Sequence, residues 1–241
     1  MTLLGGRQDK TRESIRETVT NSEEMVMLVG RLKKGKAPGR DGIQNEAWMY
    51  GTEGMRERLR KIMNEIWKGG GFPRQWTEGL IIPIHKKGDR HEVSNYRGIT
   101  LLNTSYKLYA MILHEKLCRK LDEKDMLPDG QTGFRKERGP IDNVYTLNHI
   151  VRREIRKEGG RLYALFLDLK AAFDSVNREK MWEYMRNKGV NEHLVNRMKE
   201  IYQETACKVK INDRESECFY TYRGVRQGCL LSPMLGVGER R

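Results

Sequence analysis

Asp168 is the residue whose type and position most suggest chemistry, because it follows an apolar run of strand length at residues 162–167. We expect residues 161–168 to form a buried strand, and an aspartate at the carboxyl end of such a strand lies at an edge where ligands collect. A strand-end carboxylate also often caps the turn that follows it. Taken alone, Asp168 fits that structural role better, and Phe173 and Asp174 fit a core residue and a turn residue.

Three cations surround one expected turn between two short strands. They are Lys86 and Lys87 in the segment HKKGD and Arg97 in the segment NYRG. Lysine and arginine side chains bind phosphates, and the arginine fork can donate two parallel hydrogen bonds. The same residues also fit an exposed and solvated basic loop.

Two glycine-bounded loops carry further polar groups. The first, GFRKERG, holds Arg135, Lys136 and Arg138, which are suited to follow a nucleic-acid backbone. The second, RGVRQG, holds Arg226 and Gln227 beside Gly228, where the backbone can approach a ligand closely and glutamine can bind base edges. Loops of this kind are common, so each is equally compatible with an exposed surface segment.

The composition favours a polyanionic partner. The 241 residues carry a formal net charge of +13, which points to nucleic acid or an anionic membrane surface, with a lysine-rich soluble protein as the alternative. The four cysteines and five histidines show no zinc-type spacing, and we expect free thiols in a reducing compartment. No apolar run approaches the ~20 residues of a membrane span, and the first residues lack a signal-peptide core. We therefore expect an intracellular protein of the cytoplasm or nucleus.

The pattern of elements that must position these residues is mixed α+β. Helices are expected at residues 22–34, from about 45, from about 55, and at 105–121, 141–157, 177–188 and from 191. Strands are expected at residues 80–84, 95–103, 161–168, 207–213 and 217–225. Pro83 suggests that the first of these strands lies at a sheet edge. Asn177 and Asn191 fit helix N-caps, and Gly189 fits the glycine that ends a helix.

The order of five sequence blocks is more specific than any one of them. The blocks are KAPGRDGIQNE, PIHKKGD with NYRGITLLNTSYKLYAMIL, QTGFRKERGPIDNVYTL, LYALFLDLKAAFDSV and RGVRQGCLLSPMLG. In this order and spacing they resemble the reverse transcriptases of non-LTR, LINE-type retrotransposons, over about residues 22–236. A maturase-like or telomerase-like polymerase is a weaker match, because KAPGRDG and GFRKERG favour the LINE type.

The resemblance implies a right-hand polymerase fold, with fingers and an incomplete palm. Residues 1–21 would be a polar tail, residues 22–160 a fingers-like region and residues 161–241 a partial palm. The partners implied are an RNA template, a DNA primer and deoxynucleoside triphosphates. The cofactor implied is a pair of Mg²⁺ ions, which take oxygen ligands rather than histidine or cysteine.

The resemblance also assigns roles to single residues. Asp168 would be the catalytic carboxylate and a ligand of both Mg²⁺ ions, with the carbonyl group of Leu169 assisting. Nucleotide binding would fall to Lys86, Lys87, Arg97 and Gln227, with Phe173 as a steric gate under the incoming sugar. Template binding would fall to Arg135, Lys136, Arg226 and Gly228.

The sequence departs from the family pattern in several places. Gly98 and Leu230 stand where the family usually has proline, and Gly139–Pro140 replaces a small hydroxylated pair. The family carries two adjacent aspartates on a palm hairpin, and no two aspartates are adjacent in this sequence. We therefore expect weak Mg²⁺ binding, no activity from this chain alone, and a marginally stable palm. The alternative is a catalytically inactive, nucleic-acid-binding remnant of a degenerate element.

Overall fold

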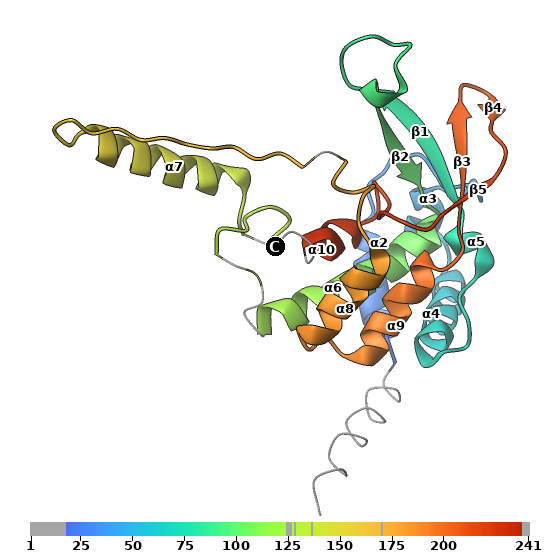
Figure 1. Cartoon of the computed structure of the whole chain (residues 1–241). Coiled ribbons are helices and arrows are strands. Elements are labelled where there is room, and N and C mark those ends of the chain that lie inside the picture. The colour runs from blue at the N-terminus through green and yellow to red at the C-terminus, as the bar shows by residue number, and fades with distance from the viewer. Residues whose placement is uncertain (1–17, 124–126, 128, 136, 170, 238–241) are drawn as a thin grey trace, which may run out of the picture.

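The structure is a computed structural model that describes residues 18–123, 127, 129–135, 137–169 and 171–237 (Figure 1). The helices are α2 (Ser22–Gly30), α3 (Asn45–Met49), α4 (Glu53–Lys68), α5 (Arg74–Thr77), α6 (Thr104–Glu123), α7 (Pro140–Ile155), α8 (Arg178–Asn187), α9 (Glu192–Tyr202) and α10 (Ser232–Val237). The strands are β1 (Gly79–His85), β2 (Tyr96–Leu101), β3 (Thr205–Ile211), β4 (Arg214–Glu215) and β5 (Phe219–Thr221). The expected mixed α+β class is confirmed.

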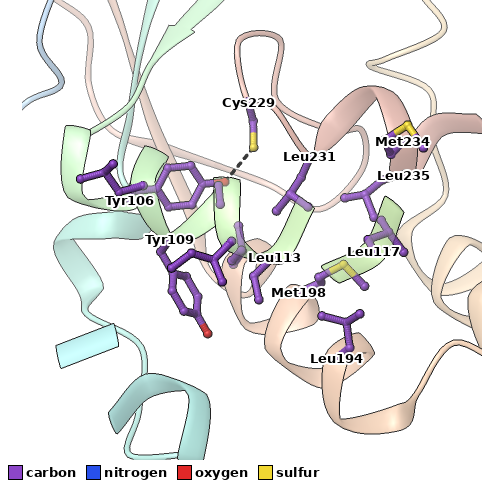
Figure 2. Close-up of a cluster of buried hydrophobic side chains, with 14 of the residues drawn as sticks. Tyr106, Tyr109, Leu113, Leu117, Leu194, Met198, Cys229, Leu231, Met234 and Leu235 are labelled. Carbon is purple, nitrogen blue, oxygen red and sulfur yellow. Dashed lines mark hydrogen bonds between the residues drawn. The ribbon is translucent and has the colours of Figure 1, made fainter. Parts of the chain in front are cut away.

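Helix α6 is the centre of the hydrophobic core. Tyr106, Leu113 and Leu117 on this helix are fully buried, and α6 packs against α2 and α9. Figure 2 shows Leu113 and Leu117 of α6 facing Leu194 and Met198 of α9. Burial of apolar side chains of this size stabilises a fold by roughly 1.5–3 kcal/mol each, so this contact contributes to the stability of the helical part.

The core also takes in the residues around α10. Leu231 and Leu235 are fully buried, and Met234 is nearly so. They lie close to Leu117 and Met198 in Figure 2. One continuous core therefore draws on residues from both sides of the expected boundary between residues 160 and 161.

The helix ends follow the local sequence. Asn177 caps α8 by accepting a hydrogen bond from the backbone N–H of Lys180, and Asn191 caps α9 by accepting one from His193. Gly189 follows α8 with a φ of +74°, a conformation that glycine adopts without strain. These three predictions are confirmed. The first helix is shorter than expected: α2 ends at Gly30, whereas the sequence predicted a helix over residues 22–34.

The sheet has the order β2-β1-β3-β4, and β5 also pairs with β3. β1 pairs antiparallel with β2 over residues 80–85 and parallel with β3 over residues 79–81 only. The prediction that β1 lies at an edge is therefore wrong for its first half. Pro83 lies beyond the pairing with β3, so its missing N–H leaves no ladder hydrogen bond unmade on that side. The expected hairpin of residues 207–225 is confirmed as β3 with β4 and β5.

The expected buried strand at residues 161–168 is wrong. Residues 161–169 have no regular secondary structure and are exposed, with Tyr163, Leu165 and Leu167 each more than four-fifths accessible. A strand that is apolar on both faces needs neighbours on both edges and cover on both faces. None of the described strands pairs with this segment, so its apolar composition alone does not make it a strand.

Helix α7 and the extended segment after it project together from the body of the molecule (Figure 1). No described residue of α7 is buried, and Ile141, Val144 and Tyr145 are exposed apolar side chains. Across the described ranges, no helix is both long enough and apolar enough to cross a membrane.

Candidate active site

Three segments that are far apart in sequence meet around the loop at residues 223–229. The backbone N–H of Thr100 in β2 donates to the carbonyl group of Gln227 at 2.7 Å. The N–H of Val225 donates to the carbonyl group of Phe173, and the N–H of Gly224 donates to Val176, both at 2.8 Å. The loop is therefore bonded to β2 on one side and to the turn at residues 171–176 on the other.

Two positions in this loop require glycine, because the loop backbone there lies very close to the backbone of the 171–176 turn and of β2. Gly224 has a φ of +77°, and a Cβ atom there would lie 2.9 Å from the Cα atom of Asp174. Gly228 has a φ of +116°, and a Cβ atom there would lie 2.8 Å from the carbonyl oxygen of Thr100. Both positions combine a left-handed backbone with a space too small for a side chain. The glycine spacing of RGVRQG thus makes the contact possible.

Asp174 holds the side chain of Gln227. The Nε2 atom of Gln227 donates to Oδ1 and Oδ2 of Asp174 at 3.2 and 3.3 Å. A carboxylate can only accept hydrogen bonds, so the amide must present its nitrogen to Asp174. The Oε1 atom of Gln227 is thereby directed away from Asp174 as an acceptor. The sequence around Asp174 predicts only a turn residue and carries no signal for this pairing.

A cavity of about 340 Å³ opens beside this pair, between β1, β2 and β3 and the 223–229 loop. Asp174, Gln227, Thr100 and Arg178 line it. Arg178 is buried and donates from Nε to the carbonyl group of Gly224 at 2.8 Å. Its Nη1 and Nη2 atoms donate to Tyr202, Thr205, Thr221 and Arg223. Arg178 therefore fixes the ends of α9, β5 and the loop together.

Arg178 is a structural residue whose role was not predicted from the sequence. Burial lowers the pKa of its guanidinium group, and the nearby positive charge of Arg226 acts in the same direction. Its hydrogen bonds to neutral oxygens offset part of the cost of burying that charge. An arginine one residue after an asparagine N-cap would normally be expected at the surface, so the sequence carried no signal for this role.

Arg226 lies in the interior rather than at a surface open to a template. It is 5% exposed, and its Nη2 atom donates to the carbonyl groups of Thr77 and Ile201 at 2.7 and 3.2 Å. Its guanidinium carbon lies 5.3 Å from the ring centroid of Tyr106 and 5.8 Å from that of Tyr202. The side chain expected to contact template instead joins the 223–229 loop to α5, α6 and α9.

The same loop is anchored at Cys229. The hydroxyl group of Tyr106 and the Sγ atom of Cys229 lie 3.0 Å apart, and both side chains are buried (Figure 2). Burial raises the pKa of Tyr106 well above its ordinary value, so the hydroxyl group stays protonated. This contact holds the end of the loop on α6.

Lys86, Lys87 and Arg97 lie together at the free end of the β1–β2 hairpin. All three are exposed, and Arg97 stands opposite Ile84 in the strand register. The backbone N–H of Lys86 donates to the carbonyl group of Asn95 at 2.9 Å, which closes the turn. The structure therefore brings the three predicted phosphate-binding cations to one exposed position.

Asp168 and Leu169 are exposed and belong to the segment at residues 161–169, which has no regular secondary structure. Phe173, the predicted gate, is half-buried and packs against the core. In the described ranges, no three histidine, cysteine, aspartate or glutamate side chains gather where a metal ion could bind. A pair of Mg²⁺ ions needs several carboxylate oxygens, so the described donors do not fit that cofactor.

Of the other residues predicted to bind template, Arg135 and Gly228 are among the described residues. Arg135 is half-buried and donates to the carbonyl group of Leu127 at 3.4 Å, within its own loop. Gly228 is exposed beside Thr100. Lys136 lies outside the described residues.

Comparison with known proteins gives the class of protein to which this arrangement belongs. Residues 84–237 match the family described as reverse transcriptase (RNA-dependent DNA polymerase). This range includes β2, the 171–176 turn and the 223–229 loop, and the chain belongs to that family.

Individual relatives narrow the class further. The chain is 28% identical over 219 residues to the transposon TX1 uncharacterized 149 kDa protein of Xenopus laevis, covering 91% of this chain and 16% of that protein. It is 29% identical over 215 residues to a probable RNA-directed DNA polymerase from transposon BS of Drosophila melanogaster, covering 88% and 23%. A Pol polyprotein from retrotransposable element R2 of Nasonia vitripennis is 25% identical over 202 residues, covering 84% and 19%.

These relatives are proteins of non-LTR retrotransposons, as the sequence blocks predicted. The chain spans less than a quarter of the length of the three relatives described.

Proposed function

We propose that this chain forms the fingers, over residues 22–160, and part of the palm, over residues 161–241, of a retrotransposon reverse transcriptase. In this proposal it binds an RNA template, a DNA primer and deoxynucleoside triphosphates inside the cell, in the cytoplasm or nucleus. The observation that carries the proposal is the fixed 223–229 loop, bonded to both β2 and the 171–176 turn. In this proposal, Gln227 and Gly228 of the loop would line the nascent base pair.

In this proposal, different residues of the chain contact different parts of the nucleotide. Lys86, Lys87 and Arg97 at the hairpin tip would neutralise triphosphate charge, which is what phosphoryl transfer most requires from protein. Gln227, oriented by Asp174, would offer its Oε1 atom as an acceptor. Phe173 would place its ring beneath the incoming sugar and exclude a 2′-hydroxyl group by bulk.

Divalent metal ions supply the charge neutralisation at the reacting phosphate in this family. Asp168 would be one ligand of such a site, and the carbonyl group of Leu169 would assist. Among the described residues, no group of three metal-ligating side chains forms around Asp168, and no two aspartates are adjacent in the sequence. We infer that the 241-residue chain binds nucleic acid without extending a primer.

A binding protein with no catalytic role is the second candidate function. The exposed position of Asp168, on a segment that pairs with none of the described strands, favours it. The two candidates agree that the 241-residue chain binds nucleic acid without extending a primer. They differ on whether Asp168 is a metal ligand.

Fluorescence anisotropy with a labelled RNA–DNA primer–template tests the binding that both candidates share. We expect the affinity to fall as salt rises, with a slope of roughly 0.7–0.9 log units for each phosphate contact. An affinity that does not change with salt would overturn the proposal, because a chain of net charge +13 would then bind without phosphate contacts.

A further inference from the structure

Helix α6 carries a histidine and a cysteine whose side chains are in contact. The Nε2 atom of His114 lies 3.5 Å from the Sγ atom of Cys118, and the Nδ1 atom lies 3.8 Å from it. The two residues are four positions apart, a spacing that places side chains next to each other on one face of a helix. The imidazole ring and the thiol group are therefore held together by the helix itself.

The pair lies at the border between the core and the solvent. Figure 2 shows that Leu113 and Leu117, the residues immediately before His114 and Cys118, belong to the buried cluster. His114 and Cys118 follow them by about 100° around the helix, and both are half-buried. The pair is thus fixed by packing on one side and accessible to a small solute on the other.

The separation of the two donor atoms fits two ligands of one metal ion. Bonds from Zn²⁺, a typical d¹⁰ ion, are about 2.0 Å long to histidine nitrogen and about 2.3 Å long to cysteine sulfur. Two such bonds at a tetrahedral angle place the nitrogen and the sulfur roughly 3.5 Å apart. An ion of this size would therefore fit between Nε2 of His114 and Sγ of Cys118 with little movement of either side chain.

Burial affects the protonation of both groups. It lowers the pKa of the His114 ring below its ordinary value of 6.5, so the ring is neutral at neutral pH and offers a lone pair. Burial also raises the pKa of the Cys118 thiol to about 11, and the negative charge of Asp122 acts in the same direction. The thiol therefore keeps its proton until an ion that binds thiolate strongly displaces that proton to solvent.

The number and type of donors favour a soft ion of low coordination number. Zinc sites use three or four protein ligands. Among the described residues, no three histidine, cysteine, aspartate or glutamate side chains gather as such a group. Thiolate and thioether sulfur favour Cu(I), which two or three donors satisfy. Met111 supplies a thioether one turn before His114, at a spacing that places it on the same face of α6.

We propose that His114 and Cys118 form a binding site for one Cu(I) ion, with Met111 as a third and weaker donor. The site is separate from the candidate active site, because other residues line the cavity beside Asp174 and Gln227. It does not depend on the proposed function. An ion held there would join successive turns of α6 and stabilise the folded chain by an amount that grows with its affinity.

Competition with bicinchoninate, a chelator whose Cu(I) complex is coloured, measures the affinity of the full chain under reducing, oxygen-free conditions. The site variant is His114→Gln/Cys118→Ser. The matched control is His149→Gln/Cys218→Ser, at an exposed histidine and an exposed cysteine. Each variant removes one imidazole and one thiol, so a difference reports the pairing of the two groups rather than their number.

We expect one ion per wild-type chain and a loss of affinity of at least roughly 100-fold in the site variant, because even an outer-shell partner of a metal contributes about 10–100-fold. The control should bind Cu(I) as the wild type does. Met111→Leu conserves side-chain volume and should lose less affinity than the site variant.

X-ray absorption at the copper edge gives a second readout that needs no substitution. We expect one nitrogen neighbour and one or two sulfur neighbours in the wild-type complex. A copper ion surrounded by sulfur alone would overturn the pairing, and this result remains decisive if the site variant does not fold.

Equal affinities of the wild type and the site variant would overturn the site. Equal losses in the site variant and the control would show that copper binds any thiol of the chain and would also overturn it. Tighter binding of Zn²⁺ than of Cu(I) would overturn the choice of ion. Nucleic-acid binding is measured separately, so none of these results decides the proposed function.

Discussion

The side-chain amide of Gln227 is held by both carboxylate oxygens of Asp174, at 3.2 and 3.3 Å. The two residues are separated by 53 positions in the sequence. They meet because Gly224 allows the 223–229 loop to lie against the backbone of the 171–176 turn. A residue that resembles a turn aspartate thereby sets the orientation of the glutamine that would contact nucleotide.

We predict that Asp174→Ala releases the Gln227 amide without unfolding the protein. Both side chains are at or near the surface, so the lost hydrogen bonds should lower the free energy of unfolding by less than about 1 kcal/mol. The ¹⁵N resonance of the Gln227 side-chain amide should shift toward that of a solvated glutamine. An unchanged resonance in the variant would show that the pairing does not form in solution.

Arg226→Ala should destabilise the fold strongly. The substitution removes the donor to the carbonyl groups of Thr77 and Ile201 and leaves a cavity between Tyr106 and Tyr202. We expect a loss of roughly 3 kcal/mol in the free energy of unfolding, measured by urea denaturation.

The control for Arg226 is Arg223→Ala, an exposed residue of the same loop, which should change stability by no more than about 0.5 kcal/mol. If Arg226→Ala weakened RNA binding at unchanged stability, the side chain would be a template contact and not a structural one.

Hydrogen exchange should separate residues 161–169 from the rest of the C-terminal half. The described residues form no backbone hydrogen bonds with this segment, so its amides should exchange nearly as fast as those of an unfolded chain. The amides of α8 and α9 should be as protected as those of α6, because all three helices contribute to one core. For these two helices, this prediction replaces the marginal stability expected from the family pattern. Slow exchange across residues 161–169 would contradict the exposed conformation.

Stability should fall on mild acidification, in part through His193. The ring of this histidine packs edge-on to Trp67, with centroids 4.4 Å apart, and burial lowers its pKa below the ordinary value of 6.5, aided by the positive charge of Arg197. The unfolded chain therefore takes up the proton first as pH falls. The stability from neutral His193 is present above pH 6.5 and is lost as pH falls through the folded-state pKa.

Urea denaturation at pH 7 and pH 5 checks this expectation. The loss of stability between the two values should be smaller in His193→Gln than in the wild type. His91→Gln, at an exposed histidine, should show the same loss as the wild type. Identical losses in all three proteins would exclude His193 as a source of acid sensitivity.

Local sequence signals predicted those elements whose causes are local. The caps at Asn177 and Asn191, the glycine at position 189 and the β3 hairpin depend on residues within one turn or one strand pair. The glycines of RGVRQG correctly marked a close approach of backbone. In each case the physical cause lies within a few residues of the predicted feature.

The failures arose where the outcome depends on distant partners. The apolar run at residues 161–168 carries every local sign of a strand, but a strand forms only beside other strands. An arginine in a glycine-bounded loop is typical of a ligand contact, but Arg226 is buried among Thr77, Ile201 and two tyrosine rings. Asp174 likewise acquires its role from Gln227, which lies 53 residues further along the chain. No pattern within a short window carries that information.

Primer extension on an RNA template, with Mg²⁺ and deoxynucleoside triphosphates, tests most directly the claim that this chain binds nucleic acid but lacks a complete metal site. The wild-type chain and Asp168→Ala should be compared at concentrations that saturate the primer–template, as shown by anisotropy. We predict saturable binding by both proteins and no extension by either. Extension by the wild type that Asp168→Ala abolishes would contradict it, because Asp168 would then belong to a working catalytic centre.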